Sequence, residues 1–203
     1  MSRVYARMLA LGVAALCAAT PAFAQSAPKA EISAGYQLLN FSIEDENESM
    51  PKGWYFDVTG NLNPLIAVVF QVGGNYKTFE ESFSAGGATA TSSVDLKVHE
   101  FLGGVRLNAR TSTAVTPFVQ VLAGGIQGSV EATATATIPG QPPFSFSDSD
   151  SGTDFGLEIG GGVNFGLSDG VGLRVGADYL RIFGEDDTGA NAFRFTVGIV
   201  LGR

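Results

Sequence analysis

The sequence predicts an all-β protein, an eight-stranded antiparallel up-and-down β-barrel that is exported and crosses an outer membrane. Three observations support this fold class. The N-terminus is typical of a secretory signal, apolar residues recur with a period of two, and long and short connections alternate along the chain.

Residues 1–24 are predicted to be a cleaved secretory signal peptide. Arg3 and Arg7 form a positive n-region, residues 8–19 are largely apolar, and residues 22–24 supply small residues at the cleavage site. The apolar stretch is shorter than the ~20 residues that a membrane-spanning helix needs. We expect residues 25–203 to form one outer-membrane β-barrel domain.

Composition excludes several classes of function. The only cysteine is Cys17, inside the signal, so no disulfide or thiolate site is expected in the mature chain. One histidine, His99, cannot form a zinc site without further nitrogen or sulfur ligands, and we predict no metal, cofactor or catalytic residue. Removing Arg3 and Arg7 changes the formal charge from −8 to −10, which argues against a nucleic-acid partner.

Period-two alternation is clearest in residues 193–201, where odd positions are apolar and even positions include Arg194, Thr196 and Gly198. Residues 171–179 follow the same pattern. Six further segments do so less clearly: residues 31–38, 54–62, 66–75, 100–108, 115–126 and 157–165.

The less apolar face favours a membrane barrel over a soluble one. A sandwich or lipocalin-like barrel also alternates, but it buries its apolar face. Here the other face is mostly Gly, Ser, Thr, Asn and Gln with a few charges, which suits the crowded interior of a narrow barrel. A soluble lipocalin-like barrel is the alternative fold.

Connections are predicted to alternate in length. Residues 42–52, 77–95 and 127–153 are long and residues 184–190 intermediate, whereas residues 63–64, 109–114 and 168–170 are short. Short periplasmic turns and long outer loops give an even strand number with both ends periplasmic. The long segments are low in complexity and acidic, so we expect mobile outer loops.

Several short sequence segments and the C-terminus resemble those of the small OmpA-type and OmpX-type outer-membrane β-barrel proteins. The segments include residues 33–36, 59–62, 72–76, 116–118 and 174–179. Members of that family resemble one another in an insertion signal on the final strand. Thr196, Gly198 and Leu201 match positions of this signal, whereas Arg203 stands where an aromatic residue is usual. The resemblance implies outer-membrane localisation and contact with the barrel-insertion machinery during assembly.

The strand residues that are predicted to point into the barrel include several charged ones. We expect these charges to pair, because an eight-stranded barrel is just wide enough to be filled by side chains. Arg174 and Asp178 share a face, with Arg194 on the next strand. The predicted lumen charge network is Glu31, Asp57, Glu100, Arg106, Glu158, Arg174, Asp178 and Arg194. A side-chain-filled lumen is the structural interpretation, and a narrow ion path is the functional one.

Outward parity places aromatic residues near the long connections, as in an interfacial aromatic girdle. The predicted girdle is Tyr36, Trp54, Tyr76, Tyr179 and Phe193. His99 has the same parity, so we interpret it as an interfacial residue.

Three functions follow from the sequence. The first is a non-enzymatic, monomeric barrel with a structural or surface-interaction role, in contact with outer-membrane lipids and lipopolysaccharide. The second is a small pore or transporter for ions or solutes. The third is an outer-membrane lipid enzyme, which would need His99 in a cleft beside a serine.

Overall fold

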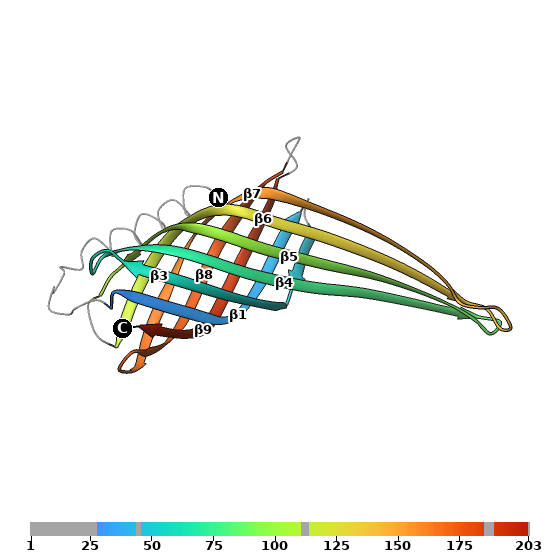
Figure 1. Ribbon diagram of the computed structural model, residues 1–203, viewed down its shortest axis with the longest axis horizontal. Coiled ribbons are helices and arrows are strands. Elements are labelled where there is room, and N and C mark those ends of the chain that lie inside the picture. Colours follow the sequence, from blue (N-terminus) through green and yellow to red (C-terminus); the bar gives the residue numbers. More distant parts are fainter. Residues whose placement is uncertain (1–27, 44–45, 111–113, 185–188, 203) are drawn as a thin grey trace.

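The computed structural model describes residues 28–43, 46–110, 114–184 and 189–202, and their strands form one closed antiparallel sheet (Figure 1). Strands that follow one another along the barrel wall are paired, and the last strand pairs with the first through twelve residue pairs, from Glu31 with Gly202 to Ser42 with Asn191. The strands are β1 (Ala30–Ile43), β2 (Glu46–Met50), β3 (Lys52–Asn61), β4 (Ile66–Ala85), β5 (Ala88–Asn108), β6 (Val115–Thr137), β7 (Phe144–Ser168), β8 (Val171–Phe183) and β9 (Ala190–Gly202).

These nine strands occupy eight strand positions in the barrel wall, here called staves, because β2 and β3 are two parts of one stave. Both pair with β1, and Pro51 separates them. Between the pairs Tyr36 with Trp54 and Leu39 with Met50, two residues of β1 oppose three residues of the other stave. An extra residue of this kind is a bulge, and proline suits it because proline has no N–H to donate to the ladder. The predicted eight-stranded up-and-down barrel is confirmed.

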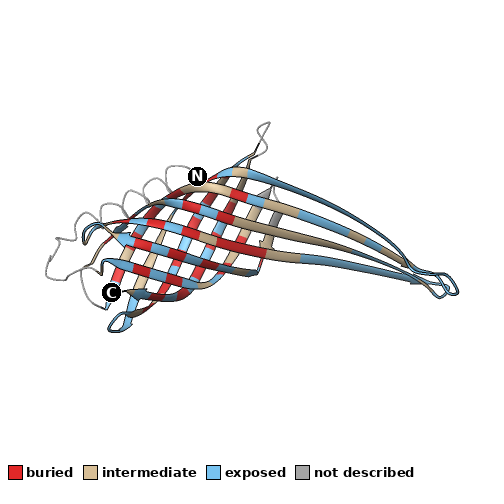
Figure 2. Cartoon of the chain, viewed as in Figure 1, coloured by how far each residue is buried: buried red, intermediate tan, exposed pale blue. Residues whose placement is uncertain are grey.

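Within the barrel wall, buried and exposed residues alternate along most staves (Figure 2). On β3, Asp57 and Thr59 are at most 1 % exposed, whereas Phe56 and Val58 are 38 % and 40 % exposed. Polar side chains therefore point into the lumen and apolar ones point outward, the reverse of a soluble barrel. The lipocalin-like alternative is wrong. In the described part of the chain, no helix is long and apolar enough to cross a membrane.

The short connections lie at one end of the barrel, with both described ends of the chain. At residues 62–65, the Asn63 side-chain oxygen accepts hydrogen bonds from the backbone N–H groups of Leu65 and Ile66, both at 2.8 Å. At the other tight turn, Gly170 has a φ of 80°, and its carbonyl accepts the Gly202 N–H at 2.9 Å. The third turn includes residues 111–113, which lie outside the described residues.

Two of the predicted long loops are strands instead. β4 and β5 stay paired up to Ala85 with Ala88, and β6 and β7 up to Ala136 with Phe144. Residues 77–85 of β4, 88–97 of β5, 128–137 of β6 and 144–154 of β7 form a four-stranded extension, here called the finger, which reaches far beyond the other staves (Figure 1).

The prediction of mobile loops at residues 77–95 and 127–153 was wrong for a physical reason. Their Ala-Thr and Ser-rich repeats are low in complexity, but they also alternate with period two, and threonine suits strands. Adjacent strands then pair the backbone polar groups without needing a large apolar core. Much of the predicted loop at residues 42–52 is likewise strand, as β1 runs to Ile43 and β2 begins at Glu46.

Hydrogen exchange tests the finger directly. The backbone amides of Val94 and Ala132, on the two inner strands of the finger, should exchange at least about tenfold more slowly than unprotected chain, because both neighbouring strands pair with them. The measurement is amide exchange of the protein in lipid nanodiscs. The amide of Gly140, at the hairpin tip, serves as the fast-exchanging control. Equal, unprotected rates in strands and tip would show a mobile loop.

Candidate functional site

The eight residues of the lumen charge network all point into the barrel and are at most 4 % exposed. They come from six strands: β1, β3, β5, β7, β8 and β9. Since charges removed from water are stable only when they are paired and hydrogen-bonded, their geometry decides whether the lumen is filled or open.

Arg194 is the centre of the first cluster. Its guanidinium donates to Glu100 Oε1 and Glu158 Oε1, both at 2.7 Å, and to Asp178 Oδ2 at 2.9 Å. The Arg194 side chain is 1 % exposed and the three carboxylates at most 2 %. One guanidinium thus joins β9 to β5, β7 and β8, on different sides of the barrel.

Asp57 is the centre of the second cluster. Its Oδ2 accepts from Arg174 Nη1 at 2.5 Å and from Arg106 Nη2 at 3.4 Å. Arg174 also donates to Glu31 Oε2 at 3.4 Å. The shared face of Arg174 and Asp178 suggested that these two are neighbours, but Asp178 pairs with Arg194 and the ion pairs of Arg174 are with Asp57 and Glu31. Residues four apart on a strand are separated by about 13 Å.

Gln120 connects the two clusters. Its Oε1 accepts from Arg106 Nε at 2.9 Å, and its Nε2 donates to Glu158 at 3.0 Å and Asp178 at 3.1 Å. It is 4 % exposed and uses both ends of its amide. The lumen charges therefore form one continuous network across the barrel.

Sequence reasoning missed three members of this site. Gln120 has the strand parity of the network but carries no charge, so a search for paired charges does not find it. Phe118 has the same parity, and its ring lies 4.6 Å from the Arg106 guanidinium and 5.2 Å from that of Arg174. Arg110 lies beyond the end of β5, where strand parity carries no information.

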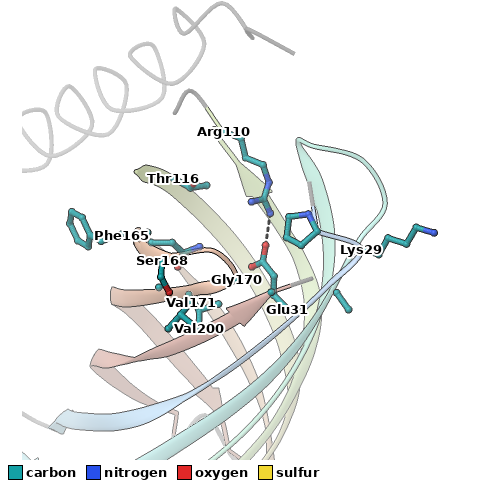
Figure 3. A pocket seen from close by; sticks show the side chains of 15 residues that line it. Lys29, Glu31, Arg110, Thr116, Phe165, Ser168, Gly170, Val171 and Val200 are labelled. Atoms are coloured by element: carbon teal, nitrogen blue, oxygen red, sulfur yellow. Dashed lines mark hydrogen bonds and ion pairs between the residues drawn. The ribbon is translucent and has the colours of Figure 1, made fainter. Parts of the chain in front are cut away.

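Arg110 lies at the periplasmic mouth and donates to Glu31 at 2.5 Å (Figure 3). It borders a pocket of about 720 Å³ that Lys29, Asn164, Phe165 and Ser168 also line. With Arg110, four guanidinium groups face the five carboxylates of the network, so the formal charge of the lumen is close to balanced, at −1.

An apolar cluster, here called the apolar cap and also missed by the sequence interpretation, packs beside the charges and continues above them to the outer end of the lumen. Leu122 and Leu180 are direct strand partners of Glu158. On β8, Leu180 and Ile182 follow Asp178 towards the outside, and on β9 Ala192 precedes Arg194. The cap is a buried cluster, defined as Leu39, Met50, Val69, Leu102, Leu122, Ile126, Leu180, Ile182 and Ala192. Leu39, Leu102, Leu122 and Leu180 are fully buried.

The predicted girdle residues lie on the outer wall. Tyr36, Trp54, Tyr179 and Phe193 are 39–53 % exposed, and Tyr76 is half-buried. The Tyr179 and Phe193 rings meet edge to face at 5.4 Å.

His99 lies in the same band of the wall. Trp54 Nε1 donates to Tyr76 Oη at 3.1 Å, and Tyr76 Oη is 3.2 Å from His99 Nε2. These three side chains pack over Gly74, where an added Cβ would lie 2.9 Å from the Trp54 Nε1. His99 thus lies on the outer wall with Tyr76 as its partner, and its place at the membrane interface stays a prediction.

Of the predicted insertion signal, Thr196 and Gly198 face the lumen and Leu201 faces outward, 50 % exposed. Arg203 lies outside the described residues, as does the predicted signal peptide at 1–24. The role of the signal stays a prediction. Among the residues that the structure describes, no three His, Cys, Asp or Glu side chains are grouped to hold a metal ion.

Replacing Arg194 tests the network. Arg194→Met keeps much of the side-chain length but leaves three buried carboxylates without their shared cation, so the free energy of unfolding should fall by about 3–5 kcal/mol. The measurement is urea unfolding in lipid vesicles, followed by heat-modifiable migration on gels.

The matched control is Arg181→Met, which removes an outward-facing guanidinium from β8 and should cost less than about 1 kcal/mol. Adding Glu158→Gln to Arg194→Met should restore part of the stability, since it removes one uncompensated charge. Equal losses for the two arginine variants would contradict the network.

Comparison with known proteins agrees with this geometry. Residues 8–200 match the outer membrane protein beta-barrel domain family. No curated protein sequence matches the chain. Ail, the attachment invasion locus protein of Yersinia pestis, solved with the heparin analogue sucrose octasulfate, is similar with a TM-score of 0.50 and 20 % identity over 85 % of this chain and 96 % of Ail.

Neisserial surface protein A (NspA) is similar with a TM-score of 0.53 and 13 % identity, over 88 % of this chain and 100 % of NspA. At these identities the similarity concerns the fold, and both folds agree with the closed barrel described above. The family match covers nearly the whole chain and fits the inverted burial of the staves. This chain therefore belongs to the outer membrane protein beta-barrel domain family and is an outer-membrane β-barrel protein.

Proposed function

We propose that this outer-membrane barrel is a non-enzymatic protein with a closed lumen, and that its finger is the surface through which it interacts. The observation that carries the proposal is the filling of the lumen by side chains from different walls. Arg194 on β9 contacts Glu100 on β5, and Arg174 on β8 contacts Asp57 on β3.

Two barriers in series support a closed lumen. An ion entering from outside first meets Leu39, Met50 and Ile182 of the apolar cap, beside the hydrogen-bonded pair of Gln37 and Asn75. It then meets the charge network, where separating a buried pair costs about 3–5 kcal/mol. Since each 1.4 kcal/mol is tenfold in an equilibrium constant, openings would be rare. These barriers argue against the alternative of a small ion or solute pore.

The surroundings of His99 support a non-enzymatic role. A Ser-His-acid site needs a histidine within hydrogen-bond reach of a serine. The hydrogen-bonding partner of His99 is Tyr76, on the lipid-facing wall. This arrangement favours the interfacial interpretation over the lipid enzyme.

We further infer that the partners of the barrel wall are outer-membrane lipids and lipopolysaccharide, and that the chain is a monomer. The apolar outer band suits acyl chains, and the aromatic girdle suits the interface. Contact with the barrel-insertion machinery during assembly would involve Thr196, Gly198 and Leu201 on β9, the strand that closes the barrel against β1.

Planar bilayer recordings test the closed lumen. The purified protein, reconstituted at many copies per bilayer, should give no stepwise conductance across the physiological voltage range. A porin reconstituted in the same way provides the positive control. Reproducible unitary steps that scale with the amount of this protein would overturn the proposal in favour of a pore.

A further inference from the structure

The finger is amphipathic, and its register defines the two faces. Because directly paired residues share a face, each row of four partners gives the composition of one face. Phe83, Ala90, Ala136 and Phe144 form one row. Its neighbours on that face are the rows Glu81, Ser92, Ala134, Phe146 and Phe79, Val94, Ala132, Asp148.

The opposite face of the finger is hydrophilic. Its rows are Ser82, Thr91, Thr135, Ser145; Glu80, Ser93, Thr133, Ser147; and Thr78, Asp95, Glu131, Ser149. This face continues the lipid-facing side of the barrel, so the lipid-facing side turns polar above the girdle. The apolar face continues the lumen side. Polarity thus inverts where the staves leave the membrane.

The apolar face is a trough with small residues on its floor and aromatic residues on its rims. On the floor, the three β6 residues are alanines and the three β5 residues are Ala90, Ser92 and Val94, while Phe83 on β4 and Phe144 and Phe146 on β7 stand at the edges. These three rings are 71 %, 71 % and 62 % exposed, and they border a groove of about 760 Å³. Exposed apolar surface of this kind marks a binding site.

At its base, the trough joins the apolar cap of the lumen. Leu96 and Val98 on β5 have lumen parity and pack against the cap. The apolar surface therefore runs from the closed mouth of the barrel to the aromatic rims, and the finger residues of each strand span about 30 Å.

The chemistry of the trough selects among occupants. Its floor offers mainly methyl groups, with the Ser92 hydroxyl as the polar side chain among them, and the backbone groups of the inner strands are used in the ladder. A sugar or a polar peptide would therefore lose hydrogen bonds there. The charges beside the trough are Glu81, Asp148 and Asp150, and Lys77, which is paired with Glu48. This acidic rim disfavours an anionic head group, and a second copy of the finger would bring a second acidic rim against it.

We propose that the trough binds a long alkyl chain carried by a neutral or cationic head group. The chain would lie along the alanine-rich floor between the phenylalanine rims, and the head group would lie at the acidic rim. Neither the closed lumen nor a structural role requires such a site, so the inference goes beyond the proposed function.

Contact quenching in lipid nanodiscs tests the site. In a Trp54→Phe background, which removes the only tryptophan, Phe144→Trp places a reporter on the rim. The probe is 12-bromododecyltrimethylammonium, whose bromine quenches tryptophan on contact. Saturable quenching is expected for Phe144→Trp, whereas Ser147→Trp, on the hydrophilic face of the same strand, should show only the weak quenching of a surface residue.

Matched charge variants in the Phe144→Trp background locate the site. Ala134→Asp places a carboxylate on the floor and should weaken binding of the alkyl chain at least tenfold. Thr133→Asp places the same charge one residue away on the opposite face and should change it little. Each variant is checked for heat-modifiable migration, so that loss of the barrel is not mistaken for loss of binding.

Two further measurements on Phe144→Trp test the head group of the ligand and the alternative that a second copy of the protein occupies the trough. 12-Bromododecanoate should quench at least tenfold less effectively than the ammonium probe, after correction for partition into empty discs. Equal or stronger quenching by the anion, or equal quenching on both faces, would overturn the proposal. The proposal would also be overturned if, before any probe is added, the emission wavelength of Phe144→Trp shifted with the number of protein molecules per disc. Such a shift would show that a second copy covers the apolar face.

Discussion

Closure of the sheet by β9 and β1 is the constraint on which the rest of the structure depends. A bilayer offers no hydrogen bonds to a free strand edge, so every stave must be paired on both sides at membrane depth. Eight staves closed in this way leave an interior that side chains fill. Charges such as Arg194 and Asp57 are then buried with no way out to water, and their pairing follows from the diameter of the barrel.

The network is best regarded as one unit. Gln120 accepts from Arg106 while it donates to Glu158 and Asp178, so a change in one cluster alters the polar surroundings of the other. Losses from separate substitutions are therefore expected to be non-additive. The apolar cap complements this unit, because it separates the buried charges from outside water and keeps their attraction strong.

Much of the barrel could be predicted from the sequence because strand parity is a local property. A period of two identifies which side chains share a face, which is why the inward orientation of Glu158 and Arg174 could be predicted. Which of them pair depends on register between distant staves. Arg110 lies beyond its strand, where parity ends. The apolar cap was missed because the inward face was expected to be polar along its whole length. The finger was taken for loops because low complexity outweighed alternation.

The two faces of the finger also restrict how its length can vary. Adding one residue to each arm of the β4–β5 hairpin would move Gly86 and Gly87 outward by one rung, and each side chain beyond the insertion would change faces. Adding two residues to each arm preserves both faces and leaves the barrel untouched. The same rule holds for β6 and β7, and the two hairpins need to change together to keep Phe83 level with Phe144. Variants of this protein with longer or shorter fingers should therefore differ in even steps per strand.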